Sequence, residues 1–247
     1  MPNIAAITPT IEVIFAHHNE PIPAEFLDFR QSNLMPMSAR QLAKWKSRRM
    51  AYFLLDQLCQ KYQIETSLLD QINKTHSGRP YLSHPNIDFN ISHSGEWVAI
   101  IFNISQPKRY VGIDIEHPQK TRPYLKLLDY YADTTEIQQI QDCKILADLD
   151  RLEDRFYLSW CLREAVLKSQ GVGIVKLSEV KHRLDQQTIH SNYCPKGILH
   201  FYSSLPFYLA FFLENISQHN VAIPIWQWKN QQYHAITGLQ PIVYRVN

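Results

Sequence analysis

Short apolar runs separated by polar turns make up most of this chain, and a few longer stretches have the spacing of amphipathic helices. Strands are predicted at residues 10–17, 89–92, 97–102 and 111–116. Helices are predicted at residues 38–62, 134–148 and 152–170, with Ser38 as the first N-cap and Gly171 as the last C-cap. After residue 180 short strand-like runs alternate with turns at Pro195, Pro206 and Pro224. This order predicts an α+β fold.

The pattern also indicates two halves. Each half runs from a helix into strands, which suits a duplicated α+β unit. A polar, turn-forming segment at residues 106–109 separates them. We therefore predict an N-terminal half at residues 1–108 and a C-terminal half at residues 109–247.

Composition narrows the class of protein. A hydrophobic content of 45% fits a packed globular domain, and a formal net charge of +2 gives no general reason to expect nucleic-acid binding. The four cysteines are scattered without a Cys-x-x-Cys pair, which favours free thiols over a zinc cage or disulfides: Cys59, Cys143, Cys161 and Cys194. The longest apolar runs are too short to cross a bilayer. We expect a cytoplasmic protein that binds neither nucleic acid nor membrane.

The strand at residues 111–116, VGIDIE, carries the first candidate chemistry. Successive strand side chains point to opposite faces, so Asp114 and Glu116 share one face and the apolar residues share the other. Two carboxylates held together repel unless a cation lies between them. The pair favours a hard divalent ion, Mg²⁺, which takes oxygen ligands alongside phosphate. The alternative is a solvated edge strand with two surface acids.

A second constellation lies on the predicted helix at residues 152–170. Trp160, Glu164 and Lys168 are four residues apart and form one stripe. A surface i,i+4 ion pair would explain Glu164 and Lys168 equally well, but the tryptophan on the same stripe indicates partial burial. Glu164 could then supply a third carboxylate to the metal, and Lys168 a positive charge for a phosphate leaving group.

Candidate phosphate-binding groups occur in two further places. Ser92 and His93 lie at the end of a predicted strand, in FNISHSG. Five cations without an intervening acid follow the start of the first helix: Arg40, Lys44, Lys46, Arg48 and Arg49. They form either the solvent-exposed face of an amphipathic helix or an anion-binding site.

Three of these segments, in this order, resemble the motifs of the 4'-phosphopantetheinyl transferases: FNISHSG (residues 89–95), GIDIE (112–116) and WCLREAVLK (160–168). Gly78-Arg79-Pro80 lies upstream of them, as expected for the larger, pseudo-dimeric branch typified by the surfactin-synthetase activator. The resemblance covers about residues 40–173.

The resemblance implies two similar α+β halves related by a pseudo-two-fold, with coenzyme A in the cleft between them. It implies transfer of 4'-phosphopantetheine from coenzyme A to a serine of an apo acyl or peptidyl carrier protein, releasing adenosine 3',5'-bisphosphate. Mg²⁺ is the implied metal, with Mn²⁺ as the substitute ion, and we expect a monomer.

Residue by residue, the resemblance also implies roles. Asp114, Glu116 and Glu164 match the metal ligands, with Glu164 as general base and Lys168 beside the pyrophosphate. The matches to coenzyme A-binding positions are Gly78, Arg79, Pro80, Ser92, His93 and Lys168, with Arg48 or Arg49 at the 3'-phosphate and Arg40 and Lys44 beside it. Glu136 matches another acid near the site. Arg79 and Arg163 stand where lysine is commoner, which keeps the charge and changes the geometry.

Two other functions stay open on the sequence. A Mg²⁺-dependent phosphodiester hydrolase could use the same carboxylates and lysine. A module that binds coenzyme A or a carrier without catalysis would not need all three carboxylates.

Overall fold

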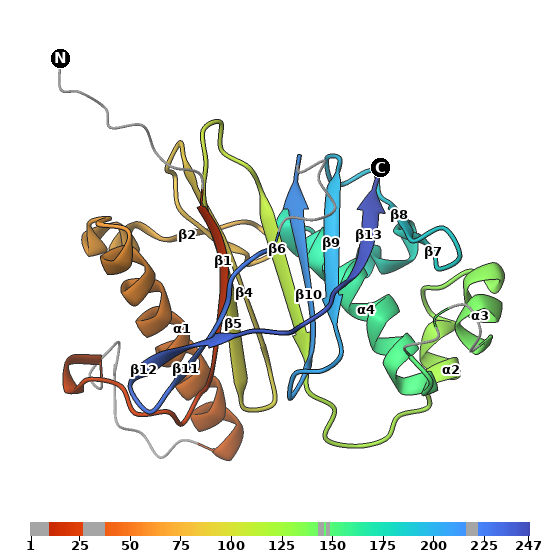
Figure 1. The fold of residues 1–247 in the computed structure, drawn as a ribbon, viewed down its shortest axis with the longest axis horizontal. Coiled ribbons are helices and arrows are strands. Elements are labelled where there is room, and N and C mark those ends of the chain that lie inside the picture. The colour runs from red at the N-terminus through yellow and green to blue at the C-terminus, as the bar shows by residue number, and fades with distance from the viewer. Residues whose placement is uncertain (1–9, 27–37, 143–145, 147–148, 216–221) are drawn as a thin grey trace.

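The computed structural model of the protein describes residues 10–26, 38–142, 146, 149–215 and 222–247 (Figure 1). Its fold is mixed α+β, which confirms the predicted class. The α-helices are α1 (Ala39–Lys61), α2 (Tyr124–Leu128), α3 (Thr134–Gln141) and α4 (Leu152–Ser169), and 3₁₀ turns span Ala24–Phe26, Thr66–Gln71 and Ile174–Glu179. The strands are β1 (Thr10–His17), β2 (Asn73–Lys74), β3 (Pro80–Tyr81), β4 (Ile87–Ser94), β5 (Trp97–Ile104), β6 (Val111–Glu116), β7 (Lys181–Arg183), β8 (Thr188–His190), β9 (Gly197–Tyr202), β10 (Tyr208–Glu214), β11 (Ile225–Lys229), β12 (Gln232–Ile236) and β13 (Ile242–Val246).

Two main sheets lie side by side. One has the order β12-β11-β1-β5-β4 and the other β6-β10-β9-β13-β8-β7, while β2 and β3 form a separate pair. Helix α1 covers one face of the first sheet, and α4 covers one face of the second (Figure 1). Each sheet with its long helix makes an α+β unit, and a pseudo-two-fold between the units stays a prediction.

The last strands cross between the sheets. β11 pairs in parallel with β1, and β12 pairs with β11, so both belong to the first sheet although they follow β10 of the second. β13 then returns to pair with β9. The division of the chain at residue 108 stays a prediction. The strands β11 and β12 come after residue 108 but belong to the first sheet, so the two sheets do not correspond to the two predicted halves.

Both faces of the central strands are buried. On β1, Ile14 lies in the core under α1, whereas Val13 lies in a third core between the sheets. That third core also contains Ile113 of β6 and Phe211 of β10. Because its apolar side chains come from both sheets, it fixes the two units against each other.

A row of side chains joins the two sheets where their edge strands β4 and β6 meet. Alternate residues of β4 accept hydrogen bonds from backbone N–H groups of β6 and of His117, the residue directly after it: Asp88 from Val111 (2.9 Å), Asn90 from Ile113 (2.9 Å), Ser92 from Ile115 (3.2 Å) and Ser94 from His117 (3.0 Å). We call this row the seam. It supplies edge N–H groups of β6 with acceptors, and it sets the register between the halves.

The ends of the three predicted helices agree with the structure within one residue, except the C-terminal end of the second. Ser38 caps α1, as predicted, by accepting a hydrogen bond from the Gln41 N–H. Gly171, with φ of +64°, follows the end of α4 as the predicted glycine cap. The prediction that the second helix continues to residue 148 is wrong where it can be judged, because α3 ends at Gln141 and Asp142 is extended.

The side chain of Arg155 explains the early end of α3. Its Nε donates to the Ile140 carbonyl at 2.5 Å, and its Nη1 donates to the Leu149 carbonyl at 2.6 Å. The described part of this segment therefore packs around a buried guanidinium. Residues 143–145 and 147–148, including Cys143, lie outside the described residues. The other three cysteines are free thiols, and none of the helices within the described ranges is long and apolar enough to cross a bilayer.

Candidate active site

A glycine sets how closely α4 approaches β6. A Cβ atom on Gly112 would lie 2.0 Å from the Ala165 carbonyl oxygen, a distance that only a residue without a side chain avoids. Gly112 shares its face of β6 with Asp114 and Glu116. The close approach therefore brings Asp114 to the side chains of α4.

The predicted cluster of Asp114, Glu164 and Lys168 is present. Lys168 Nζ lies 2.5 Å from Asp114 Oδ1 and 3.8 Å from Glu164 Oε2. The two carboxylates are only 2% and 5% exposed. The structure thus brings together side chains from strand β6 and helix α4 that are about 50 residues apart in sequence.

Two oxygen atoms in this cluster are buried without a hydrogen-bond partner: Asp114 Oδ2 and Glu164 Oε1. Such atoms are costly to bury unless a further group satisfies them. Carboxylate oxygens are the ligands that Mg²⁺ prefers, so the donor set fits a hard divalent cation, with Asp114, Glu116 and Glu164 as the residues that would hold it. Within the described residues no group of three His, Cys, Asp or Glu side chains already has the arrangement of a metal site.

Charge repulsion between the acids appears in their pKa values. Burial raises the pKa of Glu164 to about 7, and the neighbouring charge of Asp114 adds to the shift. Burial and then Asp114 also raise the pKa of Glu116. Burial lowers the pKa of Lys168, but Asp114 and Glu164 outweigh it and hold that pKa above its usual value. The site therefore contains one permanent positive charge, on Lys168, among three carboxyl groups that are each stabilised by a nearby positive charge.

Ser92 lies inside this cluster. Its hydroxyl accepts a hydrogen bond from the Ile115 N–H, receives one from Lys168 Nζ at 3.1 Å and donates to Asp114 Oδ1 at 3.1 Å. A hydroxyl has one donor and two acceptor sites, so all are occupied. The hydroxyl of Ser92 thus orients the acid and the lysine, and its contact with a phosphate stays a prediction.

His93 lies at the exposed end of β4 beside three cations. Partial burial lowers the pKa of its imidazole, and the positive charges of Lys168, Lys44 and Arg48 lower it further. The ring is therefore neutral at pH 7. The surrounding positive charge makes this end of β4 attractive to an anion.

The basic start of α1 divides into two faces. Arg40, Lys44 and Arg48 are exposed and four residues apart, so they form one stripe. Arg49 instead stacks on Trp45, with its guanidinium carbon 4.6 Å from the ring centroid, and is half-buried. Two cations of the stripe, Lys44 and Arg48, lower the pKa of His93.

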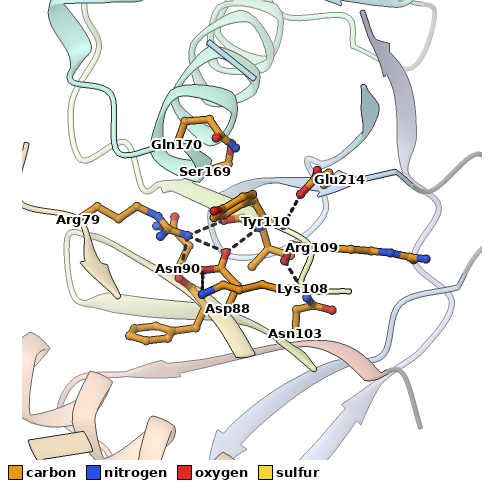
Figure 2. Close-up of polar contacts among 12 residues, drawn as sticks. Arg79, Asp88, Asn90, Asn103, Lys108, Arg109, Tyr110, Ser169, Gln170 and Glu214 are labelled. Atoms are coloured by element: carbon orange, nitrogen blue, oxygen red, sulfur yellow. Dashed lines mark hydrogen bonds and ion pairs between the residues drawn. The ribbon is translucent and has the colours of Figure 1, made fainter. Parts of the chain in front are cut away.

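The guanidinium of Arg79 binds to both strands of the seam, β4 and β6 (Figure 2). Its Nη2 donates to Asp88 Oδ2 at 2.8 Å and to the carbonyls of Phe89 and Val111 at 3.2 and 3.3 Å. A pocket of about 680 Å³ adjoins it, lined among others by Tyr81, Lys108 and Gln170. The guanidinium thus holds the halves together, and contact of residues 78–80 with coenzyme A stays a prediction.

Glu136 lies under α4. Its Oε1 accepts hydrogen bonds from Ser159 Oγ and Arg163 Nη1, both at 2.7 Å, and lies 2.9 Å from His182 Nδ1. Its Oε2 is also paired with Arg163 Nη2. This carboxylate is fully buried and anchors the helix that carries Glu164.

Trp160 is half-buried, as its position on the stripe predicts. Its ring stacks on Phe156 at 6.2 Å between centroids and meets Tyr131 edge-on at 5.7 Å. These contacts give it a packing role within the core under α4.

The seam is the functional feature that sequence reasoning missed. A period-two run of short polar side chains, Asp88, Asn90, Ser92 and Ser94, was visible in the sequence. Such a run in a buried strand indicates that its neighbour offers unpaired backbone donors. Ser94 in particular donates to Glu116 Oε2 at 2.9 Å.

Comparison with known proteins identifies the family. The profile of the 4'-phosphopantetheinyl transferase superfamily matches residues 110–223. A protein of Haemophilus influenzae, provisionally named a 4'-phosphopantetheinyl transferase, is 40% identical over 245 residues, which are 96% of this chain and 100% of that protein.

More distant relatives agree. The 4'-phosphopantetheinyl transferase Sfp of Bacillus subtilis is 33% identical over 52% of this chain and 54% of its own length. The human L-aminoadipate-semialdehyde dehydrogenase-phosphopantetheinyl transferase is 28% identical over 42% of this chain and 35% of its own. The chain belongs to the 4'-phosphopantetheinyl transferase superfamily, and its activity is the transfer of a phosphopantetheinyl group.

Proposed function

We propose that this enzyme transfers 4'-phosphopantetheine from coenzyme A to a serine of an apo acyl or peptidyl carrier protein. The observation that carries the proposal is the buried pair of unsatisfied oxygens on Asp114 and Glu164, next to the ammonium of Lys168. The serine oxygen forms a bond to the β-phosphorus while the bond to the bridging oxygen breaks. Adenosine 3',5'-bisphosphate leaves, and the serine proton passes to a base.

Each residue of the cluster has a task in that reaction. Glu164 is the base that accepts the serine proton, directly or through a water molecule. Its pKa of about 7 is that of the site without a cation, and a bound cation would lower it. Lys168 keeps its proton and stabilises the charge that develops on the departing bisphosphate. A divalent cation held by Asp114, Glu116 and Glu164, Mg²⁺ or Mn²⁺, would neutralise the pyrophosphate when bound.

The nucleotide part of coenzyme A fits the remaining features. We place the 3'-phosphate at the stripe formed by Arg40, Lys44 and Arg48, close to His93. The pocket that begins at Ser169 and Gln170, directly after Lys168, offers room for the adenine ring beside residues 78–80.

The functional test is a transfer assay against a panel of apo acyl and peptidyl carriers, read by intact mass. We expect one added phosphopantetheine on a carrier with its acceptor serine and none on the serine-to-alanine carrier. Failure with every carrier, while a reference transferase modifies them, would refute the proposal.

Alanine substitutions of Arg48 and Arg49 should have different effects on KM for coenzyme A. Arg48→Ala is expected to raise KM for coenzyme A by about tenfold, because one charge-assisted contact to the 3'-phosphate is lost, and to leave KM for 3'-dephospho-coenzyme A unchanged. Arg49→Ala, the matched control, should leave both KM values unchanged and lower the melting temperature, since its guanidinium stacks on Trp45. Equal KM increases with both donors in Arg48→Ala would contradict this placement.

A further inference from the structure

Ser94 holds Glu116 by a hydrogen bond whose direction is fixed. The Ser94 hydroxyl oxygen accepts from the His117 N–H at 3.0 Å, and its proton points to Glu116 Oε2 at 2.9 Å. A serine hydroxyl has a single proton, and an amide N–H cannot accept it. The backbone N–H of His117, directly after β6, therefore directs the proton of Ser94 to the carboxylate.

The same arrangement, in which a serine hydroxyl accepts from a backbone N–H and donates to a carboxylate, occurs two residues earlier. Ser92 accepts from the Ile115 N–H and donates to Asp114 Oδ1. Ser92 and Ser94 occupy alternate positions of β4, and their two acids occupy alternate positions of β6, so the period of the strands generates both pairs. Repetition of the arrangement on both acids distinguishes it from a chance surface contact.

Asn90 belongs to the seam but makes no hydrogen bond to a carboxylate of β6. It accepts from the Ile113 N–H at 2.9 Å, one step further from the carboxylates. The residue of β6 that corresponds to Asp114 and Glu116 at this step is Gly112, which has no side chain. Asn90 thus serves the seam alone, whereas Ser94 serves both the seam and Glu116.

We propose that Ser94 is a positioning residue that holds the Glu116 carboxylate in the conformation in which it binds the divalent cation. This inference rests on the proposed function for the identity of the site. A glutamate side chain has several rotatable bonds and loses considerable conformational entropy on being fixed. Asp114 repels Glu116, and without the serine the longer, partly exposed side chain of Glu116 is free to turn toward solvent.

The experiment measures binding of Mn²⁺ to the full-length protein by electron paramagnetic resonance, without coenzyme A. Ser94→Ala is expected to weaken Mn²⁺ binding about tenfold, the lower end of the effect of removing a partner of a metal ligand. Ser94→Thr keeps the hydroxyl and should restore affinity to within about threefold. Asn90→Ala removes a seam acceptor and should lower the melting temperature while leaving Mn²⁺ affinity within about threefold of wild type.

Two results would overturn the inference: unchanged Mn²⁺ affinity in Ser94→Ala, or equal losses in Ser94→Ala and Asn90→Ala. Circular dichroism and the Ser94→Thr variant show whether a loss reflects unfolding. A wild-type protein that binds Mn²⁺ but modifies no carrier would refute the proposed function and leave the role of Ser94 intact.

Discussion

Asp114→Ala is expected to reduce phosphopantetheinyl transfer by roughly 10²–10³-fold, the scale seen when one preorganised electrostatic group is removed from an active site. Two losses combine in this variant. A cation bound at the proposed site would lose a ligand that carries an unsatisfied, buried oxygen, and Lys168 loses its 2.5 Å partner. Glu164→Gln should have an effect of similar size, because it keeps the shape of the side chain and removes both its charge and its capacity to accept a proton.

The measurement is the initial rate of carrier modification at saturating coenzyme A, with the melting temperature recorded in parallel. Asp70→Ala and Glu65→Gln are matched controls at exposed positions and should keep the wild-type rate. Full activity of either site variant would remove the carboxylate cluster from the reaction. An equal rate loss in the exposed controls would show that the assay reports a general effect.

The carboxylate cluster could be predicted because its determinants are local. The alternation in VGIDIE places Asp114 and Glu116 on one face, and helical spacing places Glu164 and Lys168 on one stripe. What joins the strand to the helix is Gly112, whose missing side chain permits the close approach of Ala165. That contact pairs residues far apart in sequence, so no local pattern specifies it.

Other features depend on long-range pairing. The motif predicts that Arg79 contacts coenzyme A, which stays a prediction. It does not predict that the guanidinium reaches Asp88 and the Val111 carbonyl, which come together only when β4 and β6 are side by side. The return of β11 to pair with β1 joins residues more than 200 positions apart. The sequence predicts too long a helix at α3 because the arginine that donates to the Ile140 carbonyl, near its end, lies on α4.

A second large effect is expected under α4, where Glu136→Gln should lower the free energy of unfolding by about 3–5 kcal/mol. The substitution keeps the size of the side chain but leaves the buried guanidinium of Arg163 without a counter-charge. Urea unfolding at pH 7 measures the change. Glu179→Gln, which breaks the exposed pair with Lys176, is the matched control and should leave the midpoint unchanged.

A double variant distinguishes the loss of the Glu136–Arg163 ion pair from a simple loss of packing. Replacing both Glu136 and Arg163 by methionine removes the uncompensated charge, so the double variant should be more stable than Glu136→Gln. If the double variant loses as much stability as the sum of the two single changes to methionine, the two side chains do not act as a pair.

The same ion pair predicts a dependence on acid. Arg163 and the hydrogen bond from His182 outweigh burial and lower the pKa of Glu136 to about 2, from an ordinary value of 4.5. A carboxyl whose pKa is lower in the folded state contributes stability above its unfolded pKa and loses that contribution as the pH falls. The gap in unfolding free energy between wild type and Glu136→Gln should therefore be constant above about pH 5 and narrow between pH 4.5 and 2. A gap that does not change over that interval would show that Glu136 is not held ionised by Arg163.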